Sequence, residues 1–387
     1  MSSRRPLYGW LAADTISLCG TRLSMIAIPW FVLTTTGSAA QTGLVAFAEM
    51  LPYVVSKAAA GPIIDKVGTR RVSVTADVAS AALVAAIPLA HALDLLHLGV
   101  LLPLVAVAGA LRGPGDGAKA ALIPDVVDAA GVPMERVTGL GSAAERLAST
   151  AGAAGAGALV ALIGPVNALA FDAASFAVAA ALIAATAPGR VHRDAASPDE
   201  AGLGYVESLR GGWDFLRRDP VLVAIVTMVA ITNLFDAAYV AVLVPVWVHD
   251  HGFEATTLGL LFGLFSAGSL LGSLLAAAVA DRLPRFATYV VAFLVAGAPR
   301  FVVLALDVPL LVVLSVGVVG GFASGFINPI LGAVIFERIP RHLMGRVSSL
   351  NTSLCWSLIP FGGIVGGGLV AGVGLAPALL LCGAGYF

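Results

Sequence analysis

Apolar stretches of about 20 residues or more follow one another along almost the whole chain, separated by short segments rich in charge, glycine or proline. A helix needs about 20 mostly apolar residues to cross the hydrocarbon core of a bilayer, so each stretch predicts one membrane span. Hydropathy places twelve spans, at 8–33, 43–64, 72–90, 97–120, 139–163, 166–187, 220–248, 257–280, 286–306, 309–335, 347–372 and from 375 onward.

The composition supports a membrane protein. Hydrophobic residues make up 59% of the 387 residues and charged residues only 12%, which is roughly half the charged share of a soluble domain. The net charge of −1 argues against a nucleic-acid partner. The three cysteines have no CxxC or Cys/His spacing, so neither a metal site nor another cofactor is expected. The protein is expected to be monomeric in the bilayer.

The basic residues outside the spans fall on alternate loops. They are Arg4, Arg5, Lys66, Arg70, Arg71, the arginines of the 189–219 segment, Arg282, Arg285, Arg338, Arg341 and Arg346. The intervening loops 34–42, 91–97 and 249–256 contain no Lys or Arg. Because Lys and Arg accumulate in cytoplasmic loops, this pattern predicts a multi-pass protein of the plasma (inner) membrane with both termini in the cytoplasm.

The second half of the chain is a diverged copy of the first. A shift of 216 residues places Pro29 on Pro245, Gly43 on Gly259 and Asp65 on Asp281, and a shift of 210 places Met134 on Met344, Arg136 on Arg346, Gly152 on Gly362 and Gly157 on Gly367. Six spans per copy is an even number, so the copies have the same orientation. We therefore predict an all-α fold with parallel six-helix bundles at 1–188 and 220–387, joined by a cytoplasmic linker at 189–219 and surrounding a central cavity.

The stretch GPIIDKVGTRR, residues 61–71, resembles the loop motif between spans two and three of the major facilitator superfamily. Residues 14–33 and 109–125 are similar to the macrolide and multidrug efflux branch of that superfamily. The resemblance implies a secondary transporter that exchanges protons for drug-like molecules. The fifth span lacks the Gly-Pro pair of the antiporter motif, although Pro360, Gly362 and Gly363 provide a similar pattern in the repeat copy. An importer or an uncoupled facilitator is the alternative.

Opposite charges occur at matched depths in the first two spans. Asp14 and Arg22 are eight residues apart in the first span, and Glu49 and Lys57 are eight apart in the antiparallel second span. A charged side chain at the centre of a span costs about 2.5–3.5 kcal/mol, so such groups face a cavity or a partner. We predict two ion pairs, Asp14 with Lys57 and Arg22 with Glu49. Their alternative role is only to hold two helices together.

A carboxylate whose basic partner moves away is more easily protonated, which couples conformation to protonation. Arg112 and Glu145 lie at similar depth in the fourth and fifth spans, and the resemblance places Arg112 near the proton path. The proton-coupling candidates are Asp14, Arg22, Glu49, Lys57, Arg112 and Glu145.

The second half has fewer charges within its spans, mainly Asp236 and Arg300. Its predicted substrate-cavity residues form an apolar wall with a few hydrogen-bonding groups. They are Asn233, Asp236, Tyr239, Phe262, Phe265, Asn328 and Trp356.

The 61–71 motif is predicted to form a conformational latch made by Gly61, Asp65, Gly68, Arg70 and Arg71. An acid at this helix end can accept hydrogen bonds from the arginines or cap a neighbouring helix. The alternative is that the basic residues only anchor the loop in the cytoplasm.

Other function classes lack their motifs. There is no HExxH, GxSxG or GxxxxGK[ST] pattern, so neither an enzyme nor an ATP-driven pump is predicted. A scaffold or receptor would not need paired charges within its spans. The last apolar stretch, from Leu375 to Phe387, is too short to cross a bilayer and has no basic residue to anchor it, so we expect a truncated twelfth span.

Overall fold

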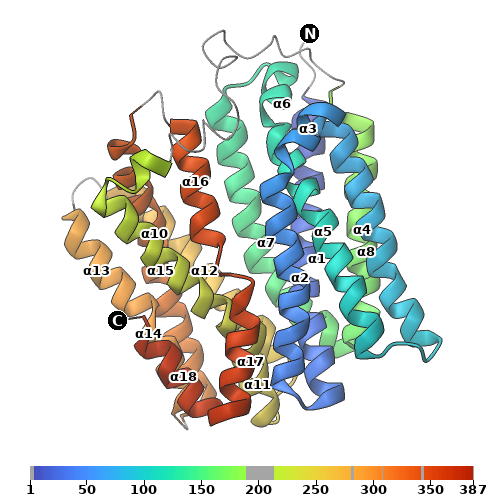
Figure 1. Ribbon diagram of the computed structural model, residues 1–387, viewed down its shortest axis with the longest axis vertical. Helices are drawn as coiled ribbons and strands as arrows, with labels where there is room; N and C mark the ends of the chain where they lie inside the picture. The colour runs from blue at the N-terminus through green and yellow to red at the C-terminus, as the bar shows by residue number, and fades with distance from the viewer. Residues whose placement is uncertain (1–3, 189–212, 280–282, 307, 341–343, 387) are drawn as a thin grey trace.

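The computed structural model describes residues 4–188, 213–279, 283–306, 308–340 and 344–386, which form helices arranged in two bundles (Figure 1). Most of the predicted linker 189–219 lies outside the described residues, as does Asp281.

The first bundle extends to residue 186. Its helices are α1 (Arg5–Thr36), α2 (Ala39–Ala59), α3 (Gly61–Val67), α4 (Thr69–Ala92), α5 (Leu98–Ala121), α6 (Ile123–Ala130), α7 (Met134–Ile163) and α8 (Pro165–Thr186). The second bundle begins at residue 220. Its helices are α10 (Pro220–Ala238), the π-helix η1 (Tyr239–Leu243), α11 (Val244–Asp250), α12 (Ala255–Val279), α13 (Arg285–Ala296), α14 (Ala298–Ala305), α15 (Leu310–Arg338), α16 (Met344–Trp356), α17 (Phe361–Val373) and α18 (Leu375–Ala384).

Ten helical segments of the described chain are long and apolar enough to cross a membrane. Two further helices complete the twelve predicted spans. Helix α2 has 21 residues and is long enough, but it carries Glu49 and Lys57 and is rich in small and polar residues. Helix α18 is apolar but has only 10 residues. The predicted fold class, an all-α membrane protein of two six-helix bundles, is confirmed.

The element boundaries repeat with the predicted offsets. Helices α7 and α16 begin at Met134 and Met344, 210 residues apart, and α2 and α12 begin at Ala39 and Ala255, 216 apart. Gly164 and Gly374 precede α8 and α18 with φ of +84° and +86°, a conformation that only glycine adopts without strain. The same turn is therefore kept in both copies.

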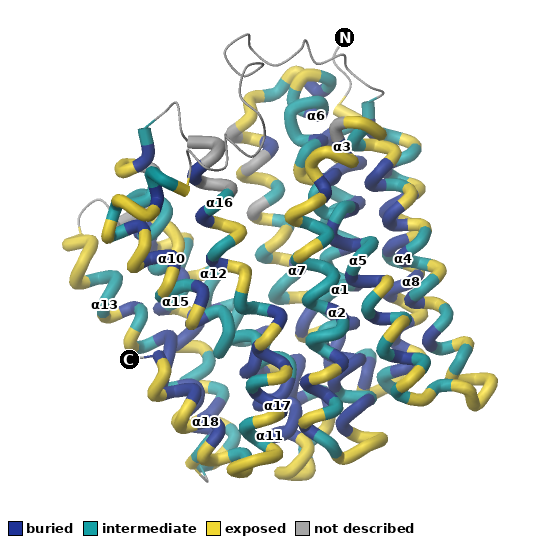
Figure 2. Tube along the Cα trace, viewed as in Figure 1, coloured by how far each residue is buried: buried dark blue, intermediate teal, exposed yellow. Residues whose placement is uncertain are grey.

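The two ends of the bundles differ in how they meet. We call the end with the loops at Lys66 and Arg338 the basic side, at the top of Figure 1, and the end with loops 34–42 and 249–256 the neutral side. At the neutral side one buried cluster joins the bundles, with Ala156 of α7 and Leu258 of α12 among its members (Figure 2). At the basic side one buried cluster, which includes Trp10, belongs to the first bundle, and a separate cluster, which includes Ile339, belongs to the second. The bundles are therefore closed against each other at the neutral side.

Glycines make this closure possible. A Cβ on Gly43 of α2 would overlap the carbonyl oxygen of Gly363 of α17, and a Cβ on Gly157 of α7 would lie 2.7 Å from the Cα of Gly259 of α12. Small residues allow membrane helices to approach this closely.

Three spans of the second bundle are interrupted near the middle of their length. Helix α10 passes into the π-helix η1 ahead of Pro245, α13 ends before Gly297 and Pro299, and α16 and α17 are separated at Pro360. Proline removes a helical hydrogen bond and disfavours a straight helix. Irregular backbone within a membrane occurs where it is covered by protein or lines a cavity, so these breaks mark where a site can form.

Asp219 caps the start of α10 at the basic side. Its Oδ1 accepts hydrogen bonds from the backbone N–H groups of Val221 and Leu222 at 2.9 and 3.2 Å, and its Oδ2 lies 2.9 Å from Arg338 Nη1. Burial opposes ionisation, but the hydrogen bonds from Arg338 and from the two amides outweigh it and hold the pKa of Asp219 below its ordinary value.

Replacing Asp219 by Ala is expected to lower the free energy of unfolding by about 1 kcal/mol near neutral pH, because the cap is lost. The folded-state pKa is the lower one, so this contribution is present above the unfolded pKa of about 3.9 and disappears as the pH falls through the folded pKa. Denaturant unfolding in detergent at several pH values measures the difference. Asp250→Ala, at the exposed end of α11, is the control. A pH-independent difference would contradict the assignment.

Candidate functional site

A buried ion pair joins α2 and α5 in the first bundle. Arg112 Nη1 donates a 2.8 Å hydrogen bond to Glu49 Oε1, and the two side chains are only 8% and 11% exposed. The helices come this close because Gly109 and Gly113 of α5 face α2, and a Cβ on Gly109 would overlap the carbonyl oxygen of Glu49. The glycines on either side of Arg112 thus bring its guanidinium to the carboxylate.

The predicted pairs Asp14–Lys57 and Arg22–Glu49 are not formed in this conformation. Glu49 is bonded to Arg112, while Arg22 Nη2 donates a 2.9 Å hydrogen bond to Ser149 Oγ of α7. Counting residues along the spans predicts the depth of each charge but not the side of the helix on which it lies. Helix α1 turns Arg22 toward α7, and α2 turns Glu49 toward α5.

The other two charges of the predicted pairs also have different neighbours. Lys119 is the base whose charge acts most strongly on Asp14. Lys57 Nζ donates to the hydroxyl of Tyr53 at 3.0 Å, and that hydroxyl donates to Asp116 Oδ2 at 3.1 Å.

Lys57 also contacts the opposite bundle. Its Nζ lies 4.7 Å from the centroid of the Trp356 ring, a cation–π distance. Trp356, predicted to lie in the substrate cavity, therefore packs at a bundle-to-bundle contact. Glu145, predicted near Arg112, instead lines a separate cavity with Arg146 and Asn328.

The two charged residues predicted within the spans of the second bundle, Asp236 and Arg300, form a cluster with Tyr386. Asp236 of α10 accepts hydrogen bonds from Arg300 Nη2 of α14 and from the hydroxyl of Tyr386. Arg300 Nη2 also donates to the Tyr386 hydroxyl at 2.8 Å, and its guanidinium lies 4.9 Å from the ring centroid of Tyr239. The interruption between α13 and α14, just before Arg300, positions this side chain.

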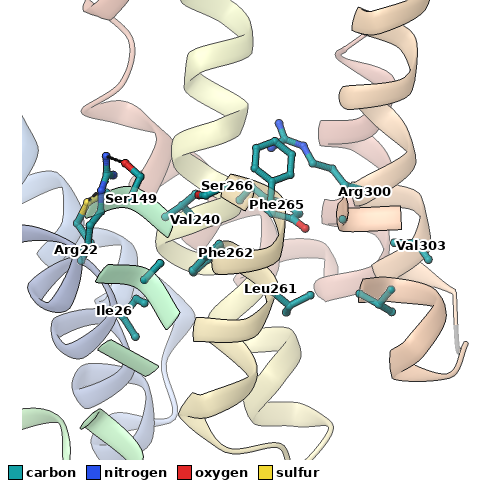
Figure 3. A pocket seen from close by; sticks show the side chains of 15 residues that line it. Arg22, Ile26, Ser149, Val240, Leu261, Phe262, Phe265, Ser266, Arg300 and Val303 are labelled. Carbon is teal, nitrogen blue, oxygen red and sulfur yellow. Dashed lines mark hydrogen bonds between the residues drawn. The ribbon is translucent and has the colours of Figure 1, made fainter. Parts of the chain in front are cut away.

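Two cavities of about 220 Å³ each lie between the bundles. The first, which we call the arginine cavity, is lined by Arg22, Tyr239, Phe262, Phe265 and Arg300 together with Ser149, Ser266 and aliphatic residues (Figure 3). The second, the carboxylate cavity, is lined by Glu49 of the first bundle and by Asn233, Asp236 and Pro360 of the second.

Two further cavities adjoin them. One of about 320 Å³, lined by second-bundle residues, includes Asn233, Asp236 and Asn328, and one of about 330 Å³ lies between Glu145 and Asn328. The structure thus places every predicted substrate residue except Trp356 in the wall of at least one of these four cavities.

Sequence reasoning missed three buried charges of the first bundle. Lys119 Nζ lies 3.0 Å from Asp77 Oδ1 and donates to Ser17 Oγ at 2.9 Å. Asp172 of α8 accepts a hydrogen bond from Ser24 of α1. All three charges lie inside predicted spans. A charged group within a span must face a cavity or a partner, and this argument, which singled out Glu49, applies to them equally.

Replacing Lys119 by Met is expected to lower the free energy of unfolding by about 3–5 kcal/mol, because Asp77 is left buried without its partner. The double variant Asp77→Leu, Lys119→Met removes both charges and should recover most of this loss. Unfolding in detergent compares the variants, and Arg285→Met, which breaks an exposed pair with Glu337, should cost less than about 1 kcal/mol. A Lys119→Met protein as stable as the original would show that the pair is unimportant.

The residues of the predicted latch extend from the start of α3 to the first turn of α4: Gly61 begins α3, Gly68 lies between the helices, and Arg70 and Arg71 belong to α4. Gly68 has φ of +100°, which favours glycine, and Arg70 donates a hydrogen bond to the carbonyl oxygen of Ala184 in α8. This contact stays within the first bundle. The Asp65 side chain lies outside the described part of the chain, so the latch remains a prediction.

Two six-helix bundles that enclose cavities between them, with charges buried in the cavity walls, define an α-helical membrane transporter. Comparison with protein families agrees: the model of the Major Facilitator Superfamily matches residues 11–366. The chain belongs to this superfamily.

The chain is 33% identical over 388 residues to the multidrug efflux pump Tap of Mycobacterium tuberculosis, covering 98% of this chain and 90% of that protein. It is 32% identical over 390 residues to Tap of Mycolicibacterium fortuitum, covering 98% and 92%.

Two solved structures share the fold at low sequence identity. A variant of the nucleoside transporter NupG superposes with a TM-score of 0.80 at 13% identity, covering 98% of this chain and 97% of that one. A bacterial homologue of the human lysosomal transporter Spinster, in an inward-facing and unoccupied conformation, superposes with a TM-score of 0.75 at 14% identity, covering 100% and 95%.

Proposed function

We propose that the protein is a secondary active exporter that exchanges protons for small amphipathic molecules across the plasma membrane. The observation that carries the proposal is the carboxylate cavity. Glu49 of the first bundle and Asp236 of the second line the same space, and each is bonded to an arginine of its own bundle, Arg112 or Arg300. Because the cavity lies between the bundles, their relative movement can change which side of the membrane supplies protons to Glu49.

In this mechanism the bundles rock about the cavities and expose them alternately to the two sides. The basic side is the cytoplasmic one, as the positive-inside pattern indicates, and the conformation closed at the neutral side accepts substrate from the cytoplasm. After the bundles close at the basic side, Glu49 takes a proton from outside, and its attraction to Arg112 is lost. The return to the cytoplasm-facing conformation carries the proton inward.

The direction of transport is supported by the similarity to relatives named as multidrug efflux pumps. The division into bundles at 1–188 and 220–387 with a cytoplasmic linker is part of the proposal, as are the cytoplasmic termini and the monomeric state. A monomer is sufficient for this mechanism, because one chain contains the two bundles that alternating exposure requires.

The test is transport into proteoliposomes with an acidic lumen, using permanently charged and neutral amphiphiles and protein-free vesicles as the control. Protons leaving the lumen in exchange for substrate should drive accumulation above the external concentration. A proton-coupled importer would be driven in the opposite direction, and an uncoupled facilitator would stop at equal concentrations. Either result would contradict the proposal.

A further inference from the structure

The arginine cavity has an unusual charge distribution. Two guanidinium groups line it from opposite bundles, Arg22 of α1 and Arg300 of α14, and no carboxylate belongs to its lining within the described part of the chain. Figure 3 shows the two arginines on opposite sides of the space, with Phe262 and Phe265 between them. The wall of this cavity is therefore mostly apolar, with a few neutral polar groups such as Ser149 and Ser266, and its charged residues are both basic.

The two arginines differ in how their charges are balanced. Arg300 is bonded to Asp236. Asp236 does not line the arginine cavity, but it lines the carboxylate cavity and the cavity of about 320 Å³. Arg22 contacts only neutral groups at hydrogen-bonding distance among the described residues, Ser149 Oγ at 2.9 Å and the sulfur of Met25 at 3.7 Å. Its Nε is buried without a hydrogen-bond partner in the same part of the chain.

Neither Glu145 nor Glu49 is bonded to Arg22. Glu145 is the acid whose charge acts most strongly on Arg22, but it lines the adjoining cavity near Asn328. Glu49, the partner predicted from the sequence, is bonded to Arg112. Among the residues that the structure describes, Arg22 thus has no contacting carboxylate in this conformation.

A cation held in an apolar wall raises the free energy of the protein unless an anion pairs with it. A guanidinium presents several N–H donors in a fixed plane and binds a carboxylate through two parallel hydrogen bonds. The sulfur of Met25 is a weak acceptor that a carboxylate can replace. The adjacent Ile26, Phe262 and Phe265 offer the apolar and aromatic surface that a ring would contact.

We propose that the arginine cavity binds amphipathic anions, with the carboxylate of the ligand on Arg22 and its aromatic body against Phe262 and Phe265. Amphipathic anions would then be the substrate class of the proposed exporter. Their transport depends on the proposed function, but their binding does not. Binding itself follows from the charges of the cavity.

The experiment measures equilibrium binding to the full-length protein in nanodiscs of zwitterionic lipid, without any gradient. Three probes share one apolar body and differ in the charge of the head group: 2-naphthoate, 2-naphthamide and 2-naphthylmethylammonium. Calorimetry should show that naphthoate binds at least tenfold more tightly than the amide and that the ammonium compound binds most weakly. Equal binding of the three probes, or preference for the ammonium compound, would overturn the proposal.

Arg22→Gln removes the charge and keeps a polar side chain of similar shape. The preference for naphthoate over the amide should fall to about one, while Arg22→Lys, which keeps the charge but not the planar fork, should keep part of it. An unchanged preference in Arg22→Gln would show that Arg22 does not hold the anion. If Arg22→Gln does not fold, the three-probe comparison on the original protein still decides the charge preference.

These results are separable from those on proton-driven export. If the protein prefers naphthoate but does not accumulate substrate against a gradient, the anion site is supported and the proposed export is contradicted. If the protein accumulates other amphiphiles but shows no preference for naphthoate, the proposed export is supported and the anion site is contradicted.

Discussion

Glu49→Gln is expected to reduce transport driven by a pH gradient to the rate measured without one. Gln keeps an oxygen that accepts a hydrogen bond from Arg112, but it cannot take up or release a proton. Glu49 has the geometry for this role because its carboxylate is bonded to Arg112 of another helix and lines the cavity shared by both bundles. Downhill movement of substrate along its own gradient should continue, since it needs no proton.

The measurement is substrate accumulation in proteoliposomes with and without an acidic lumen. Glu337→Gln is the matched control, because Glu337 is exposed and paired with Arg285 away from the cavities. Thermal unfolding must be compared as well, since neutral Gln leaves the charge of Arg112 without its counterion. If a folded Glu49→Gln protein still accumulates substrate in response to the pH gradient, another carboxylate carries the proton.

The fold could be predicted from the sequence because a bilayer leaves few alternatives. Backbone groups inside lipid must be paired within a helix, so apolar stretches of sufficient length become spans. The repeat was equally clear, since α7 and α16 begin at the aligned residues Met134 and Met344. Helix α2 lies where hydropathy placed the span 43–64, although it is less apolar than the ten segments that are clearly long and apolar enough to cross a membrane.

The contacts of the charges could be predicted only in part. The rise per residue predicts the depth of Arg22 and Glu49 along their spans, but it does not predict which neighbouring helix each side chain faces. The neighbour that each helix faces depends on how the bundle packs, and glycines such as Gly109 decide this by letting α5 approach α2. The pair Asp77–Lys119 was missed because the rule for buried charges was not applied to every span.

The closure at the neutral side was encoded in the repeat but could not be recognised without the structure. The shift of 216 aligns Gly43 with Gly259, and the shift of 210 aligns Gly157 with Gly367. In the structure Gly43 packs on α17 and Gly259 packs on α7, so the two contacts between the bundles are copies of each other. The sequence alignment shows which glycines correspond, but it does not show that they meet across the bundles.

Gly43→Ala is expected to shift the protein away from the conformation that is closed at the neutral side. The added Cβ would overlap the carbonyl oxygen of Gly363, and neither backbone can give way unless α2 and α17 separate. Overpacking of this kind costs about 1–3 kcal/mol, which changes the ratio of two conformations by about 5- to 150-fold. A conformation with the neutral side open lacks the contact and does not incur this cost.

The shift can be measured by electron–electron resonance between spin labels on Thr36→Cys of the first bundle and Glu254→Cys of the second, both exposed at the neutral side. The three native cysteines are free and are replaced by Ala beforehand. Gly43→Ala should populate longer distances between the labels. Gly368→Ala is the control on α17, because a Cβ there meets no atom within 4 Å and the distances should not change. If Gly43→Ala leaves the distances as they are, the glycine contact does not hold the neutral side closed, and the separation of α2 from α17 is not part of the transport cycle.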